Sequence, residues 1–248
     1  MAVRRETVGG QIAERLRGDI LFRRIQPGEV LSQEAMCQRF ETSRMPVRDA
    51  LRQLTHEGFL ERINGNRLRV TRMDRIDLLD MFWLEATVHA LATKRATDRH
   101  QSDPEKFAGL RIMQEEMEAC AQSCDYAKAS EINRLFHRTI NYMAESPKLL
   151  STLRSISLAI QGEFINEVPE SLGPIIAEYR AIIDAMENGD GELAGELMFA
   201  HVQGAATRIA DDLMGRTSSP DDQLSVGILP ALAAALRSRD DTPTGQQS

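Results

Sequence analysis

Three arginines, Arg44, Arg48 and Arg52, recur at every fourth position of the sequence. This spacing places their guanidinium groups on one face of a helix. A guanidinium offers a planar fork of N–H donors that fits guanine O6 and N7 or a phosphate, and a helix N-terminus adds backbone N–H groups and a positive dipole. These residues could therefore contact DNA. The alternative is that they form only the solvated face of an amphipathic helix.

Two histidines farther along the chain could bind a small molecule or a metal ion. His137 follows Asn133 by one helical turn, so the amide and the imidazole share a helix face. His201 follows the apolar stretch 193–198. Imidazole is a hydrogen-bonding group and a common metal ligand. The alternative is that each histidine is a hydrogen-bonded core residue.

The arginines lie in a segment that predicts a helix-turn-helix. Ser32 can cap a short helix, Glu41 and Thr42 interrupt it, and Ser43 can begin a second helix that Gly58 ends. The apolar residues on the inner faces of these two helices are Met36, Cys37, Phe40, Val47, Ala50, Leu51 and Leu54. The residues expected to contact DNA at the outer start of the second helix are Ser43, Arg44, Met45, Arg48 and Arg52. DNA-binding proteins place such a helix end in the major groove.

A hairpin is predicted after the second helix. Two short β-compatible segments, 59–63 and 67–70, flank Asn64-Gly65, which favours a tight turn. We expect this hairpin to be the wing of a winged helix-turn-helix domain, with Asn64 and Gly65 contacting DNA. Apolar residues at helical spacing from Val8 to Leu21 predict one further helix at the start of the domain.

The charge of the chain is divided unevenly between its two parts. The formal net charge of the 248 residues is −7, yet residues 1–72 hold 14 arginines against 9 acidic residues, which is a net charge of +5. The other 176 residues hold 16 basic and 28 acidic residues, a net charge of −12. A basic N-terminal part can neutralise phosphates, whereas DNA would repel the rest. This difference in charge predicts two domains, of which only the N-terminal one contacts DNA.

The sequence has no apolar run approaching the length of a membrane span, and its N-terminal segment lacks the apolar core of a signal peptide. We therefore expect a cytoplasmic protein that does not contact a membrane.

From residue 74 onward the pattern is helical, without a convincing strand. The predicted helices span about 74–98, 102–124, 126–144, 147–166, 170–188 and 190–213. The fold class is therefore mostly α, and the second domain is predicted to be an all-α antiparallel bundle that can enclose a pocket. We expect a DNA-binding domain at 1–72, an effector-binding and dimerisation domain at 73–215, and a partly disordered tail at 216–248.

A set of N-terminal residues carries a family resemblance. These residues are Pro27, Gly28, Glu29 and Leu31, the run SRMPVRDAL at 43–51, and then Leu54, Glu57, Gly58 and Leu60. The segment of about 8–70 resembles the winged-helix domain of GntR-superfamily bacterial transcription regulators. This resemblance implies a homodimer that binds a pseudo-palindromic double-stranded DNA operator, most often as a repressor.

Further residues resemble the ligand-binding domain of the FadR-type branch of that superfamily, called FCD. They are Leu84, Glu85, Ala92, Asn133, Phe136, His137, Glu178, Arg180, Ala181, Ile182, Asp184, Ala185, Gly189, Asp190, Ala194 and His201. Many members bind a divalent metal through Asp or Asn and three histidines. The resemblance therefore implies Asn133, His137 and His201 as ligands of zinc or nickel.

Two departures from the FCD pattern change what we expect of the pocket. Tyr179 stands where the middle histidine is usual, and zinc prefers imidazole, thiolate or carboxylate ligands. We therefore expect no required metal, with Asn133, His137, Tyr179 and His201 hydrogen-bonding the effector directly. Met81 stands where an arginine that pairs with an effector carboxylate is common, which weakens the family's preference for carboxylates here.

These observations predict a ligand-responsive transcription regulator, a repressor that a small metabolite releases from its operator, and not an enzyme. One alternative is a metal-dependent enzyme that uses His137 and His201, but the sequence has no nucleophile elbow, phosphate loop or HExxH motif. A second alternative is an architectural DNA-binding protein without an effector, which would need no second domain of this size.

Overall fold

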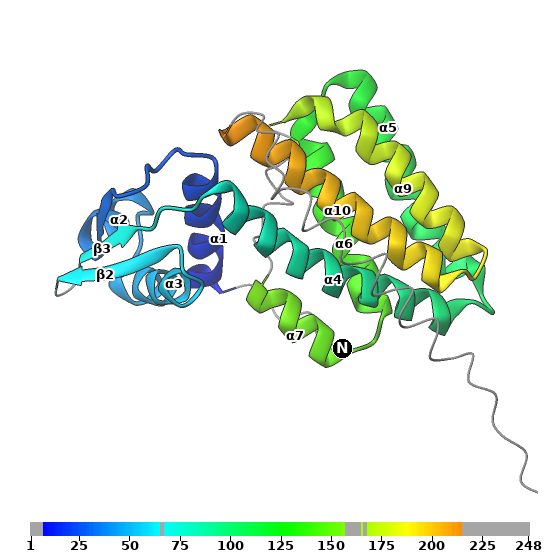
Figure 1. The fold of residues 1–248 in the computed structure, drawn as a ribbon, viewed down its shortest axis with the longest axis horizontal. Helices are drawn as coiled ribbons and strands as arrows, with labels where there is room; N and C mark the ends of the chain where they lie inside the picture. The colour runs from blue at the N-terminus through cyan, green and yellow to red at the C-terminus, as the bar shows by residue number, and fades with distance from the viewer. Residues whose placement is uncertain (1–6, 65–66, 157–164, 166–167, 215–248) are drawn as a thin grey trace, which may run out of the picture.

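The computed structural model describes residues 7–64, 67–156, 165 and 168–214, which form a small α/β part and a larger helical part (Figure 1). The first part contains α1 (Val8–Leu21), α2 (Gln33–Arg39), α3 (Arg44–His56), β1 (Val30–Ser32), β2 (Leu60–Asn64) and β3 (Arg67–Val70). The second contains α4 (Arg75–His100), α5 (Ala108–Ser123), α6 (Tyr126–Met143), α7 (Pro147–Ile156), α9 (Leu172–Glu187) and α10 (Gly191–Met214). The mostly α fold with a winged helix-turn-helix is confirmed.

The sheet differs from the prediction by one strand. It is antiparallel with the order β1-β3-β2, so the predicted hairpin is present and β1 extends it on the other edge. The segment Val30–Ser32 is too short to show an alternating pattern, and Ser32 also caps α2 by accepting a hydrogen bond from the Ala35 N–H at 3.2 Å. Ser32 was predicted to cap the helix, but it was not predicted to belong to a strand.

Two predicted helices of the bundle begin differently. The segments expected at 102–124 and 170–188 each open with a short 3-10 helix, Pro104–Phe107 before α5 and Pro169–Ser171 before α9. Proline suits the first position of such a turn because its missing N–H would have no helical partner there. The helix expected at 147–166 is described only as far as Ile156, and the rest of that prediction and the tail at 216–248 lie outside the described residues.

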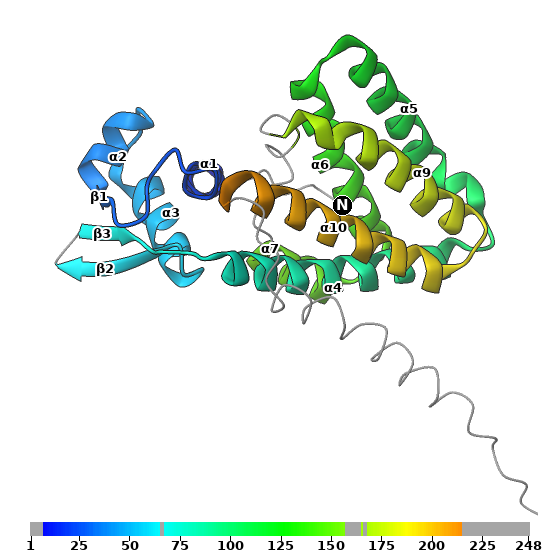
Figure 2. The ribbon, with the colours of Figure 1, turned by 45° about the horizontal axis from the view of Figure 1, so that its top comes forward.

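The longest helix, α4, follows the winged part directly and runs antiparallel beside α10 (Figures 1 and 2). A capping box between Asp74 and Asp77 fixes its start. Its inward face carries Leu78, Leu79, Phe82, Ala86, Ala92 and Ala96, and also the polar residues Glu85, His89, Thr93 and Thr97. Leu84 and Leu91 face outward instead, with 54% and 42% of their surface exposed.

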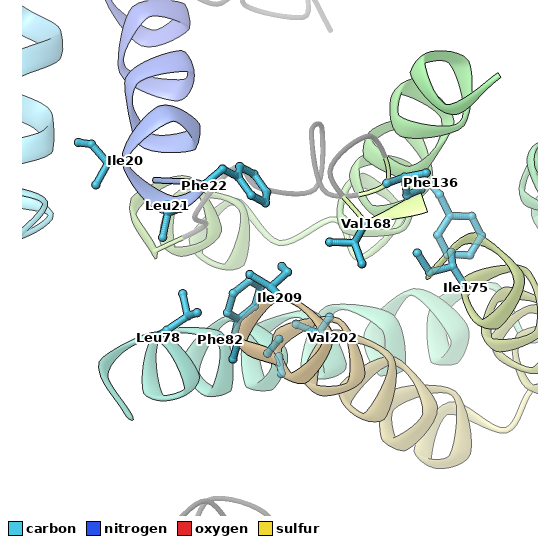
Figure 3. Packing of buried hydrophobic residues seen from close by; sticks show 14 of the residues in the cluster. Ile20, Leu21, Phe22, Leu78, Phe82, Phe136, Val168, Ile175, Val202 and Ile209 are labelled. Carbon is cyan, nitrogen blue, oxygen red and sulfur yellow. The ribbon is translucent and has the colours of Figure 1, made fainter. Parts of the chain in front are cut away.

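The hydrophobic core is continuous between the two parts. Figure 3 shows Leu21 and Phe22, at the end of α1, facing Leu78 and Phe82 of α4. The start of α4 therefore packs against the winged part as well as within the bundle. None of the described helices has both the length and the apolar character needed to cross a bilayer.

Candidate functional site

All five residues of α3 and its N-cap that were predicted to contact DNA are exposed to solvent. Ser43, Arg44, Met45, Arg48 and Arg52 all face outward, with Met45 exposing 65% of its surface. The opposite face is buried through Val47, Ala50, Leu51 and Leu54. This division follows from the helical spacing of the apolar residues.

The start of α3 is held close against α1. A Cβ atom on Gly9 would come within 3.1 Å of the Pro46 carbonyl oxygen, so a larger residue there would push the two backbones apart by a few tenths of an ångström. At the other end, Gly58 takes a φ of +84° and turns the chain into β2. The exposed arginine face therefore has fixed supports at both ends of the helix.

The arginines of the winged part fall into two classes. Some are bound within the fold: Arg17 forms a buried bidentate pair with Glu57 at 2.7–3.0 Å, and the buried Asp19 carboxylate accepts hydrogen bonds from Arg24 and Arg39. By contrast, the guanidinium groups of Arg44, Arg48 and Arg52 make no ion pair or hydrogen bond within the described ranges. Exposed guanidinium groups without protein partners are available to an anionic ligand.

A groove of about 440 Å³ opens between α3 and the hairpin. Its lining residues are Gln33, Arg48, Leu51, Arg52, Thr55, His56, Arg62 and Leu68. Arg62 and His56 were not predicted to lie in this place. The signal for Arg62 was available, because it is a cation on the same strand face as the apolar Leu60.

The structure describes the hairpin up to Asn64 and again from Arg67, but not the two residues between them. Asn64 pairs with Arg67 in the sheet register, after a bulge between Arg62 and Asn64. Gly65 lies outside the described residues. The DNA contacts expected of Asn64 and Gly65 therefore stay predictions.

The four residues predicted to bind the effector are brought together inside the bundle. Asn133, His137, Tyr179 and His201 come from three helices, and each has at most 3% of its surface exposed. The Tyr179 hydroxyl donates to Asn133 Oδ1 at 2.5 Å, and the Tyr179 ring stacks on Phe136 with centroids 3.6 Å apart. The Nε2 atoms of His137 and His201 lie 3.1 Å apart. We call these four residues the buried polar cluster.

The hydrogen bonds assign the protons in this cluster. Burial, with smaller contributions from neighbouring histidines, lowers the pKa of His137 well below 6.5. Burial also lowers the pKa of His201, against the opposing effect of Glu178, so both imidazoles are neutral at pH 7. Glu178 Oε2 lies 2.6 Å from His201 Nδ1, which therefore carries the proton.

That assignment leaves one acceptor in the cluster without a donor. With its proton on Nδ1, His201 has a lone pair on Nε2, so His137 Nε2–H must donate across the 3.1 Å contact. The remaining His137 nitrogen, Nδ1, is then an acceptor. It is buried and has no hydrogen-bond partner among the described residues, and an unmatched buried polar atom of this kind costs about 1–3 kcal/mol.

The structure adds residues that the sequence analysis missed. His89 on α4 is buried beside His137, with ring centroids 5.0 Å apart, and its Nδ1 lies 3.2 Å from Asn141 Oδ1. Glu85 lies one turn earlier, 3.5 Å from His89 Nε2. The pair Glu85 and His89 interrupts the apolar face of α4 at helical spacing, and this was the signal that could have identified them.

Glu178 connects the cluster to the surface. Burial alone would raise the pKa of its carboxyl, but the hydrogen bond from His201 and the positive charge of Arg208 lower it below the ordinary value. Arg208 Nη1 lies 3.2 Å from Glu178 Oε1. A charged pair therefore borders the neutral imidazoles.

Zinc or nickel does not fit the donor atoms gathered here. Asn133 Oδ1 already accepts from Tyr179, and burial, followed by the charge of Glu178, raises the pKa of that phenol well above its ordinary value of 10.0. Of the implied ligands, only His137 and His201 offer imidazole, and zinc prefers imidazole, thiolate or carboxylate. Within the described part of the chain, no three His, Cys, Asp or Glu side chains are arranged to hold a metal ion.

Comparison with known families divides the chain in two. Residues 9–70 match the family described as "Bacterial regulatory proteins, gntR family". Residues 80–204 match the family described as "FCD domain".

Similar proteins cover most of the chain. It is 25% identical over 201 residues to the "Probable D-xylose utilization operon transcriptional repressor" of Paenarthrobacter nicotinovorans, which covers 80% of this chain and 87% of that protein. It is 20% identical over 202 residues to the HTH-type transcriptional repressor RspR of Escherichia coli K12, with the same coverage of 80% and 87%. The structure of E. coli McbR/YncC resembles it with a TM-score of 0.63 at 19% identity, over 80% of this chain and 94% of that one.

Proposed function

Because the chain belongs to the FCD-containing branch of the GntR family of bacterial regulatory proteins, we propose that it is a cytoplasmic repressor that a small-molecule effector releases from its DNA operator. The observation that carries the proposal is the separation of two polar sites. Arginines without a partner among the described residues form an exposed face on α3, and a buried polar cluster lies inside the bundle. The names of two relatives, both transcriptional repressors, support repression over activation.

Arg44 and Arg48 are proposed to contact base edges from the start of α3. Both are exposed there and lack partners within the described residues, whereas Arg17 and Arg39 are held by carboxylates. Ser43, Met45 and Arg52 complete this face. Guanidinium groups at the N-terminal end of a recognition helix can form paired hydrogen bonds with guanine in the major groove.

The buried polar cluster is proposed to bind the effector without a resident metal. His137 Nδ1 is an acceptor without a donor in the part of the chain that the structure describes, so the effector should present a hydroxyl or ammonium hydrogen to it. An ionised carboxylate has only acceptor atoms and would not satisfy this nitrogen. Met81 is half-buried against the core and supplies no positive charge, so nothing at that position favours a carboxylate.

Transmission to DNA is proposed to run through α4. This helix carries Glu85 and His89 beside the cluster, and its first turns pack against the winged part through Leu78 and Phe82. An effector that shifts α4 would therefore change how the winged part is held. This is a coupling of two sites through one packed element.

The protein is proposed to act as a homodimer on a pseudo-palindromic operator. Ile76, Leu84 and Leu91 are exposed on α4 at intervals of eight and seven residues, which places them along one face. Leu193 on α10 is also exposed. Exposed apolar stripes of this kind are typical of protein interfaces, and a dimer doubles the number of base pairs that are read.

Two substitutions test the proposal. Genomic fragments are first selected for binding to the purified wild-type chain, and pooled metabolites are then screened for release of the fragment. Arg48→Ala should weaken fragment binding, whereas His137→Asn should bind the fragment normally and no longer respond to the effector. The control Arg69→Ala should change neither property, because Arg69 is paired with Glu61 at 2.8 Å. Normal fragment binding by Arg48→Ala would refute the DNA assignment, and normal release from His137→Asn would refute the effector assignment.

A further inference from the structure

We propose that the effector is an uncharged molecule with several hydroxyl groups, a sugar or an alditol, and that Ser130 is a further residue that determines this specificity. The inference rests on the proposed function and deepens it, because it names the chemical class that the buried polar cluster accepts. It also extends the site along α6 to a residue outside that cluster. The observation that carries it is a pair of unsatisfied polar groups on one face of α6.

Helix α6 carries a polar stripe on the side that faces the histidines of α4 and α10. Its members recur at intervals of three and four residues and therefore share one face; they are Ser130, Asn133, His137 and Asn141. Ser130, Asn133 and His137 each have only 2% of their surface exposed. Buried polar side chains of this kind need hydrogen-bond partners along the whole stripe.

Two groups of this stripe have no partner among the described residues. They are the Ser130 hydroxyl and His137 Nδ1. A serine or threonine inside a helix often donates to a backbone carbonyl oxygen one turn earlier, as Thr93 and Thr97 do in α4. Ser130 makes no such bond within the described part of the chain. A ligand that hydrogen-bonds to both groups would remove the cost of leaving them unmatched.

The two groups require different partners. His137 Nδ1 is an acceptor and needs a donor, whereas the hydrogen of the Ser130 hydroxyl needs an acceptor. An ionised carboxylate offers acceptors only, and an ammonium group offers donors only. Each hydroxyl group offers both. A molecule with several hydroxyl groups can therefore satisfy both residues, which stand roughly 10 Å apart along the axis of α6 at 1.5 Å per residue.

The charged side chains that border the cluster already have partners. Glu178 Oε2 lies 2.6 Å from His201 Nδ1, and Glu178 Oε1 lies 3.2 Å from Arg208 Nη1. Glu85 Oε1 lies 3.5 Å from His89 Nε2. A charged effector would therefore bring an uncompensated charge into a buried site, which is strongly unfavourable. An uncharged effector avoids this cost.

The experiment compares probes that share a carbon skeleton and differ in charge. The uncharged series consists of pentoses, hexoses and their alditols, the acidic series of the matching aldonates, and the basic series of the matching aminoalditols. Calorimetry measures their binding to the full-length chain, and release of the selected genomic fragment measures the response. At least one uncharged probe should release the fragment and bind at least about 10-fold more tightly than its acidic and basic counterparts.

Ser130→Ala tests the residue. The variant should bind the tightest uncharged probe about 3–10-fold more weakly than the wild type, because one hydrogen bond is lost. Without a probe it should be at least as stable to heat as the wild type, because the hydroxyl that it loses has no partner among the described residues. The matched control is Thr97→Val, which removes a buried hydroxyl that already donates to the Thr93 carbonyl oxygen at 2.9 Å and should leave affinity unchanged.

Three outcomes overturn the inference. An acidic or basic probe that binds more tightly than its uncharged counterpart overturns the chemical class, and so does failure of every uncharged probe to bind. Equal affinities of the wild type, Ser130→Ala and Thr97→Val exclude Ser130 from the site. In each case, release of the fragment by another metabolite, lost in His137→Asn, would leave the proposed function intact. A wild-type chain whose fragment no metabolite releases would refute the proposed function itself.

Discussion

At the scale of single residues, Tyr179 determines the chemistry of the buried polar cluster. Its hydroxyl donates a hydrogen bond to Asn133 Oδ1. Its ring stacks on Phe136 and lies beside the imidazole of His201. A phenol held in its protonated form is a hydrogen-bond donor and a poor metal ligand.

Replacing Tyr179 with histidine should convert the cluster into a metal site. Tyr179→His would add a third imidazole beside His137 and His201 and would free the Asn133 oxygen. Zinc or nickel affinity, measured by titration against a competing chelator, should rise by at least about 100-fold. Tyr179→Phe is the matched control, because it removes the hydroxyl without adding a ligand and should show no gain. A wild-type chain that binds zinc as tightly as Tyr179→His would contradict this prediction.

The buried histidines should also make stability depend on pH. Burial lowers the pKa of His137 and His201 in the folded chain, so below pH about 6.5 the unfolded chain binds protons that the folded chain does not. The free energy of unfolding should therefore be highest above pH 6.5 and should fall as the pH decreases, by up to about 1.4 kcal/mol per pH unit for each histidine.

Urea denaturation between pH 5 and pH 7.5 measures this dependence. His137→Gln should reduce the slope of the free energy of unfolding against pH. Equal slopes for the wild type and His137→Gln would show that His137 does not titrate differently in the folded and unfolded chains.

At the scale of elements, α3 is positioned by a buried ion pair as well as by apolar packing. Arg17 of α1 forms three hydrogen bonds with the Glu57 carboxylate at the end of α3, and the side chains are only 4% and 11% exposed. Such a pair fixes the relative position of two helices, although replacing both partners with apolar groups often costs little.

Removing one member of this pair should destabilise the winged part. Glu57→Ala leaves the Arg17 guanidinium buried without its carboxylate and should lower the free energy of unfolding by about 3–5 kcal/mol. Glu61→Ala is the control, because its pair with Arg69 is about half exposed and should contribute at most about 1 kcal/mol. Chemical denaturation compares them, and equal losses for the two variants would contradict the structural role of the buried pair.

At the scale of the whole molecule, the outward face of α4 exposes apolar side chains among the described residues, and we propose that it contacts a second copy. The stripe of Ile76, Leu84 and Leu91 lies opposite the face that packs against α10 and the rest of the bundle. It belongs to the same helix that leads from the winged part to the buried polar cluster. Dimerisation through α4 would therefore place the two winged parts in a defined relation.

A charged side chain introduced into this apolar stripe should dissociate the proposed dimer. Leu84→Glu should shift the chain from dimer to monomer, as measured by sedimentation, because an ionised carboxylate in an apolar interface is strongly unfavourable. Ile112→Glu is the control: Ile112 is similarly exposed, at 56%, but lies on α5. A monomeric wild type, or dissociation by Ile112→Glu alone, would exclude the α4 interface.

Several features could be derived from the residues alone. Apolar periodicity predicted α1, α3, α4, α6 and α10 within a few residues of their ends, since this pattern follows from local geometry. The same pattern placed Arg44, Arg48 and Arg52 on an exposed face. Local signals failed for β1, a three-residue strand whose formation depends on pairing with β3.

The sequence by itself determined the fold class, the charged face of α3 and three members of the buried polar cluster, Asn133, His137 and His201, whereas Tyr179 was added by the resemblance to the FCD domain. Only the tertiary structure decided which arginines are held by carboxylates, because Arg17 meets Glu57 across 40 positions of the chain. It alone placed Arg62 in the groove and His89 beside His137. Contacts between distant segments depend on how helices and strands pack, and the periodicity within one segment carries no information about its partner.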